Sequence, residues 1–132
     1  MSSRARRQLS EQAIQRRPEQ VIHRAVVAHL KARGAPGLFW FHVPSGAFFG
    51  GRHQGAIMKS LGWMAGLPDI IAIKRGKPYA LELKVEGGKL SRAQEACLIR
   101  LRECGVTATH AHGLDQAIRV LEAWDILVGR RQ

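Results

Sequence analysis

The sequence predicts an α/β protein in which a mixed β-sheet has helices on both faces. Three observations indicate this class. A helical apolar period follows residue 17, two apolar runs are joined by a short polar turn, and a helix–strand–helix pattern follows Gly87-Gly88. In chain order the elements are α-β-(α)-β-β-α-β-α. A length of 132 residues and 45% hydrophobic content are sufficient for one domain with one core.

The first predicted helix begins at Pro18 and ends at Gly34, since proline favours the first helical position and glycine the position after the end. Its apolar stripe consists of Ile22, Val26 and Leu30, continued by Arg33. Glu19 lies on the same stripe. The helix dipole favours a carboxylate in the first turn, but it does not explain why that carboxylate is on the apolar side.

A strongly apolar first strand is predicted at residues 38–43, followed by a Gly-rich segment, 44–66, with a short helix at about 56–61. The segment has no Gly-Lys-Ser/Thr sequence, which excludes a nucleotide-cradling loop. Arg52, His53 and Lys59 make it a candidate DNA-facing loop, and a merely flexible connection is the alternative.

Residues 70–74 and 79–85 are predicted to form a hairpin with 75–78 as its loop, so that Asp69 lies opposite Lys84. Side chains alternate between the faces of a strand, which places Asp69, Glu82 and Lys84 on one face. The Asp69 and Glu82 carboxylates, with Cβ atoms roughly 7 Å apart, could share one Mg²⁺. An ordinary solvated Lys–Glu pair is the alternative.

After Gly87-Gly88, Ser91-x-x-Gln94 is typical of a capping box that starts a helix ending at Gly105. Capping alone is sufficient to explain Gln94. A fourth strand is predicted at 106–111 and a final amphipathic helix at 114–128.

The ordered set of Glu19, Pro68-Asp69, Glu82-x-Lys84 and Gln94 resembles the PD-(D/E)xK nuclease superfamily. More narrowly, the chain is similar to the stand-alone VRR-NUC domains of phages and bacteria. The similarity extends over residues 17–127 and includes the stretches 58–62, 66–69 and 89–94. One departure is the sequence at residues 44–46, Pro-Ser-Gly, where the family often has an asparagine.

The resemblance implies a restriction-endonuclease-like fold and a Mg- or Mn-dependent endodeoxyribonuclease. Asp69, Glu82 and Lys84 would be catalytic, with Gln94 as an auxiliary residue. The ions would be held by Glu19, Asp69, Glu82 and the Leu83 carbonyl. The alternative is a basic DNA-binding module that lacks catalysis, and an RNA-binding or nuclease-inhibiting protein is a third class.

A formal net charge of +11 indicates a polyanionic partner, and nucleic acid is favoured over a membrane because no long apolar stretch is present. DNA contacts are expected at Arg52, His53, Lys59 and Lys89. The domain is expected at 17–128, between mobile basic tails at 1–16 and 129–132. The first seven residues contain no apolar segment and therefore no secretory signal, so a cytoplasmic protein of a bacterial or phage-infected cell is expected.

Cys97 and Cys104 are seven residues apart in one predicted helix, roughly 10 Å along its axis, which is too far for a disulfide. Two buried thiols are expected, and a zinc site with His110 and His112 is the alternative. A histidine general base, His42 or His53, is an alternative route to cleavage.

The active form is expected to be a homodimer that selects branched DNA, such as a four-way (Holliday) junction, because paired incisions need two sites at a fixed spacing. Small stand-alone family members resemble junction-resolving nucleases. The candidate interface residues are Trp124, Ile126, Leu127, Val128 and Phe48-Phe49. The alternative for these residues is packing in the core.

Overall fold

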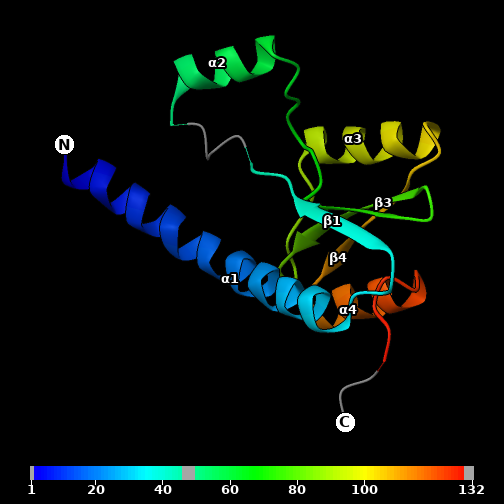
Figure 1. The fold of residues 1–132 in the computed structure, drawn as a ribbon. Coiled ribbons are helices and arrows are strands. Elements are labelled where there is room, and N and C mark those ends of the chain that lie inside the picture. The colour runs from blue at the N-terminus through cyan, green and yellow to red at the C-terminus, as the bar shows by residue number, and fades with distance from the viewer. Residues whose placement is uncertain (1, 46–49, 130–132) are drawn as a thin grey trace.

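The computed structural model describes residues 2–45 and 50–129, with the backbone alone for residues 8–17. Its elements are α1 (Ser3–Arg33), β1 (Leu38–His42), α2 (Arg52–Ser60), β2 (Ile70–Lys74), β3 (Lys77–Lys84), α3 (Arg92–Glu103), β4 (Thr107–His112) and α4 (Leu114–Ala123). Within this described part, four strands form one sheet in the order β1-β2-β3-β4. The first three are antiparallel neighbours, and β3 and β4 are parallel (Figure 1). The mixed sheet and the predicted element order are confirmed.

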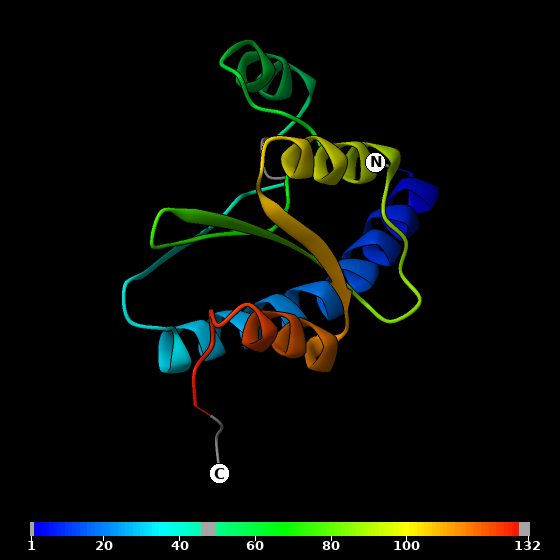
Figure 2. The same cartoon turned by 90° about the vertical axis from the view of Figure 1, so that its right-hand side faces the viewer.

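Two apolar clusters pack on the opposite faces of the sheet, as the alternation of side chains along β3 requires. Leu81 and Leu83 point toward α1 and α4, where they join Val26 and Leu30. Ala80 points toward α3, where it packs with Leu98 and Ala108. Figure 2 shows α3 on one side of the sheet, with α1 and α4 on the other.

The first helix begins at Ser3, so the predicted start at Pro18 is wrong. Ser2 caps the helix by accepting a 3.2 Å hydrogen bond from the Ala5 N–H. Residues 3–17 are mostly Arg, Gln, Ala and other strong helix formers, which outweigh the one hydrogen bond that Pro18 removes inside the helix. The domain boundary predicted at residue 17 therefore falls within α1.

The hairpin between β2 and β3 has a two-residue turn, Arg75-Gly76, instead of the predicted four-residue loop. Both turn residues have positive φ, 51° and 76°, as the tight turn that suits the twist of paired strands requires. Lys74 therefore lies opposite Lys77, not Tyr79. A slip of two residues preserves the alternation, so the predicted faces of β3 are correct although the pairing is not.

The C-terminal helix ends at Ala123, so its predicted extension to Val128 is wrong. Asp125 has a φ of 56°, which turns the chain back so that Ile126 and Leu127 enter the core. Trp124 packs against the same core, with its ring 5.3 Å from that of Tyr79. Of this predicted interface set, only Val128 is exposed, and Phe48-Phe49 lie outside the described residues.

The two cysteines differ in environment. Cys97 is buried as predicted, whereas Cys104 is exposed because it is the C-cap of α3. Both are free thiols.

Within the described ranges, no helix is both long enough and apolar enough to cross a membrane.

Candidate active site

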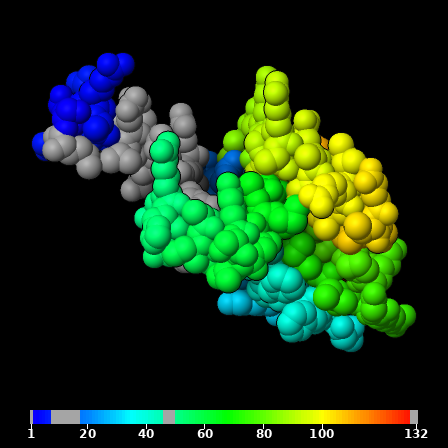
Figure 3. All heavy atoms as spheres, turned by 90° about the horizontal axis from the view of Figure 1, so that it is seen from above, coloured from blue at the N-terminus to red at the C-terminus, as the bar shows by residue number. Residues whose placement is uncertain are grey.

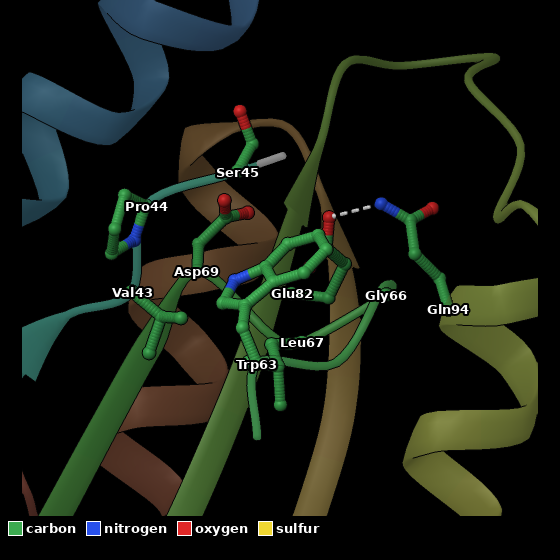
Figure 4. Close-up of a pocket in the computed structure, with 9 residues that line it drawn as sticks. All are labelled: Val43, Pro44, Ser45, Trp63, Gly66, Leu67, Asp69, Glu82 and Gln94. Carbon is green, nitrogen blue, oxygen red and sulfur yellow. Dashed lines mark hydrogen bonds between the residues drawn. The ribbon is translucent and has the colours of Figure 1, made fainter. Parts of the chain in front are cut away.

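The predicted catalytic residues meet at one end of the sheet. Asp69 directly precedes β2, Glu82 lies within β3, and Gln94 lies in the first turn of α3. These three side chains line one pocket (Figure 4). Its other walls are formed by Val43, Pro44, Ser45, Trp63, Gly66 and Leu67. The pocket therefore has a carboxylate pair between largely apolar walls.

Asp69 is fixed through both its side chain and its main chain. Its Oδ2 accepts a 2.8 Å hydrogen bond from the Leu83 N–H, across from the point where β2 starts. Its carbonyl oxygen accepts a 2.9 Å hydrogen bond from the Val43 N–H, and His42 Nδ1 also lies 2.9 Å from it. The carboxylate is thus held between β1 and β3 in one orientation.

Glu82 is a buried acid, with only 4% of its surface exposed. Burial raises the pKa of Glu82 to about 8 from an ordinary 4.5, and the Asp69 carboxylate adds to the rise. Lys84 opposes that rise in pKa, with its Nζ 3.9 Å from Glu82 Oε1. Burying Glu82 beside the half-buried Asp69 carboxylate is unfavourable, and the single nearby lysine does not bring the pKa of Glu82 back to its ordinary value.

Gln94 caps α3 and also contacts Glu82. The capping box is confirmed: the Ser91 N–H donates to Gln94 Oε1 at 2.9 Å, and the Gln94 N–H donates to Ser91 Oγ at 3.1 Å. The amide Nε2 donates to Glu82 Oε1 at 2.9 Å. Because an amide has a donor as well as an acceptor, glutamine can cap the helix and bind Glu82 at once, which a glutamate anion could not do.

Glu19 reaches the site through Lys84. Lys84 Nζ is 3.9 Å from Glu19 Oε1, the same distance as from Glu82 Oε1. The Glu19 side chain is 44% exposed, whereas that of Lys84 is 11% exposed. Across the described residues, no three His, Cys, Asp or Glu side chains are grouped so that they could hold one ion. Asp69 and Glu82 are therefore the close pair, and Lys84 lies between Glu82 and Glu19.

At Gly66, the chain segment that leads to Asp69 lies directly against the start of α3. Its φ is +82°, and a Cβ added there would lie 2.4 Å from the Ala93 carbonyl carbon and oxygen. Contact with backbone atoms this close cannot be relieved by moving a side chain. The absence of a side chain at residue 66 therefore allows α3 to bring Gln94 to Glu82.

His23 is a neighbour of the site that the sequence reasoning missed. Its ring packs edge-on against that of His42, with centroids 4.4 Å apart. Burial lowers the pKa of His23, and His42 lowers it further, whereas the Asp69 charge raises it. The available signal was its position four residues after Glu19, which places both side chains on one side of α1.

His110 and His112 lie beside the site on β4, where they are the strand partners of Glu82 and Lys84. His110 Nδ1 is 2.9 Å from His112 Nε2. Burial, followed by the neighbouring His112, lowers the pKa of His110. Cys104, their partner in the alternative zinc site, is exposed at the end of α3.

The predicted DNA contacts are all exposed. Arg52, His53 and Lys59 lie on α2, and Lys89 lies between β3 and α3. Figure 3 shows the face that carries both α2 (green) and α3 (yellow). None of the four residues belongs to the described set that lines the pocket.

The sheet order, the helices on its two faces and the Asp-Glu-x-Lys arrangement define a restriction-endonuclease-like α/β protein. The family model for the VRR-NUC domain matches residues 17–115, most of the chain, and the chain belongs to the VRR-NUC family. This is a family of nuclease domains, which implies DNA as the substrate.

A solved structure described as a VRR_NUC domain protein has the same fold. It matches with a TM-score of 0.68 and 22% sequence identity, over 83% of this chain and 89% of that chain. No curated protein matches this chain.

Metal-free Glu82→Gln is expected to become more stable than the wild type as the pH rises. A folded-state pKa of about 8, above the ordinary 4.5, means that the folded wild type keeps a proton that the unfolded chain loses between these values. The wild-type free energy of unfolding therefore falls across that window, and glutamine removes this contribution. Thermal melts in EDTA from pH 5 to 9 would measure it, with Glu95→Gln on the exposed side of α3 as the control. Parallel pH profiles for wild type and Glu82→Gln would contradict the assignment.

Gly66→Ala is expected to lower the free energy of unfolding by about 2–5 kcal/mol, since it combines a strained φ with overpacking against α3. Gly76→Ala is the matched control, because Gly76 has a φ of +76° with nothing within 4 Å of an added Cβ. It should cost only about 1–2 kcal/mol. Urea titrations of the two variants would compare these costs, and equal losses would show that the contact with Ala93 is unimportant.

Proposed function

We propose that the protein is a Mg²⁺- or Mn²⁺-dependent DNA endonuclease that hydrolyses phosphodiester bonds at the Asp69–Glu82 pocket. The observation that carries the proposal is the buried Glu82 carboxylate beside the half-buried Asp69 carboxylate. A fold gains nothing from placing an acid at 4% exposure beside a second acid unless a cation or a reacting group uses them.

The residues present fit a hard divalent cation. Carboxylate oxygens are the ligands that Mg²⁺ and Mn²⁺ prefer, and the raised pKa of Glu82 marks a place where positive charge is in deficit. Asp69 and Glu82 would hold the ion, with the Leu83 carbonyl as a further oxygen donor. Glu19, which lies beside Lys84 in this structure, would have to move toward the pair to join them. Such an ion, when bound, lowers the pKa of a water molecule and stabilises charge on the phosphate.

The chain's own residues would orient and balance these charges. The Leu83 N–H aims one oxygen of Asp69, and the Gln94 amide aims one oxygen of Glu82. Lys84, near both Glu82 and Glu19, has the charge to orient the attacking water or to neutralise the phosphate oxygens as negative charge develops. The basic residues of α2 and Lys89 would contact the DNA backbone on the same face.

A basic DNA-binding module without catalysis is the alternative function. This function would also explain the net charge of +11. It would not explain the acids at the pocket, because carboxylates repel phosphate. Metal dependence distinguishes the two functions.

Asp69→Asn, Glu82→Gln and Lys84→Ala are each expected to abolish cleavage while the fold and DNA binding are retained. The two carboxylate changes remove charge without removing side-chain volume, whereas Lys84→Ala removes the charge together with a largely buried aliphatic stem. The measurement is the cleavage of labelled linear and branched DNA in Mg²⁺, Mn²⁺ or EDTA, with circular dichroism to monitor the fold. EDTA should stop the wild type. Wild-type turnover in any of the three variants, or full activity in EDTA, would contradict the proposed site.

We further propose that the active form is a homodimer that prefers branched DNA such as a four-way junction. One such site cuts one strand, and a two-fold dimer places two sites at a fixed spacing. Since Ile126 and Leu127 are in the core, the interface must use other surfaces. Light scattering at micromolar concentration should give twice the monomer mass, and matched four-way and flap DNAs should each be cut faster than linear duplex. A monomer that cuts linear duplex as fast as branched DNA would contradict both parts.

A further inference from the structure

An exposed aromatic strip occupies the part of the sheet that α3 leaves uncovered. It is formed by Phe39 and Phe41 of β1 and Ile73 of β2, which are 65%, 42% and 38% exposed. Phe39 lies opposite Ile73, and Phe41 lies opposite Ile71. Ile71 packs with the α3 cluster, so the strip faces the same side of the sheet as α3. Figure 3 shows β1 (cyan) at the surface of this face.

The strip is continuous with the active-site pocket. Side chains two residues apart on a strand share a face, so Phe39, Phe41 and Val43 form one row along β1. Val43 lines the pocket, and so does Asp69, which starts the corresponding row of Ile71 and Ile73 on β2. A strand of DNA whose phosphate lies at Asp69 and Glu82 could therefore continue directly along the two rings.

The two rings contact each other at an angle and leave their outer faces open. Their centroids are 6.1 Å apart and their planes meet at 57°, so the rings do not stack on each other. Bases of a duplex rise by about 3.4 Å along each strand and cover one another's faces. Bases of an extended unpaired strand have free faces that can stack on aromatic side chains of a sheet.

We propose that Phe39 and Phe41 stack on the bases of an unpaired DNA strand that leads away from the scissile phosphate. This inference rests on the proposed nuclease function and specifies its substrate: DNA in which a single-stranded arm adjoins the cut. Beyond the strip, the exposed Arg75 in the hairpin turn places positive charge at the end of the row of Ile71 and Ile73, where the backbone of that arm would continue.

Charge favours DNA over a second protein copy as the occupant of the strip. A net charge of +11 attracts a polyanion, and the proposed homodimer needs a contact that leaves the pocket and this strip open to DNA. The strip also begins at the pocket, where a substrate must lie and where a second copy would block access to Asp69.

The test measures binding in EDTA to a labelled duplex that carries a single-stranded thymidine arm at one end or at the other. The same duplex without the arm is the comparison. Phe39→Ala and Phe41→Ala should each weaken binding of the armed DNA by about 5- to 150-fold and leave binding of the blunt duplex unchanged. Phe41→Trp should retain the affinity. Phe39→Leu/Phe41→Leu, which keeps apolar surface without an aromatic ring, should lose most of the affinity that the arm adds. Circular dichroism would show that each variant is folded.

Three results would overturn the proposal: equal loss on armed and blunt DNA, full armed-DNA affinity in the double leucine variant, or conversion of a dimer to a monomer by Phe39→Ala/Phe41→Ala. The last would make the strip a self-association surface. Because the binding assay needs no cleavage, the two proposals fail separately. If the phenylalanine variants lose armed-DNA binding but the wild type never cleaves DNA, the stacking proposal stands and the nuclease proposal fails. If the wild type cleaves DNA but the variants bind armed DNA as tightly as the wild type does, only the stacking proposal fails.

Discussion

The burial of Glu82 on the central strand β3 constrains the rest of the site. A carboxylate at this depth needs partners from its surroundings, and each neighbouring element supplies one interaction. The Gln94 amide of α3 donates a hydrogen bond to Glu82, and the Lys84 ammonium at the end of β3 lies near it. The Asp69 carboxylate, directly before β2, raises the pKa of Glu82. These interactions leave a deficit of positive charge. That deficit is the physical basis for expecting a cation at this place, and a bound cation would in turn attract a phosphate.

The position of α3 follows from two local features with different causes. Gly66 lets the chain before Asp69 pass against Ala93 without a side chain between them. The capping box fixes where the helix begins, and its Gln94 then has one amide nitrogen left to donate to Glu82. A capping interaction worth about 1 kcal/mol thereby orients a residue that lines the pocket. Helix stability and the orientation of Glu82 depend here on the same side chain.

Sequence reasoning predicted the faces of β3 because they depend only on parity. The predicted pairing of β2 and β3 was wrong by two residues, yet Glu82 and Lys84 lie on the predicted face. An error of one residue would have placed both on the opposite face. The start of α1 and the end of α4 could not be obtained in this way. Pro18 is compatible with either a helix start or a helix interior, and the turn at Asp125 follows from the burial of Ile126 and Leu127, which is a tertiary effect. His23 was missed because its partner His42 is remote in sequence.

The placement of α3 over β3 and β4 has consequences on both sides of the candidate site. The helix covers β3 and β4 through Leu98, Ala80 and Ala108, and it leaves β1 and part of β2 open. A longer or more central helix would bury Phe39 and Phe41 and would also close the approach to Asp69. Access to the carboxylate pair and exposure of the aromatic strip therefore have one structural cause. The cost of leaving apolar rings in water, about 25 cal/mol for each Å², persists unless a ligand covers them. A strand of bases that enters the pocket is in the right place to do so.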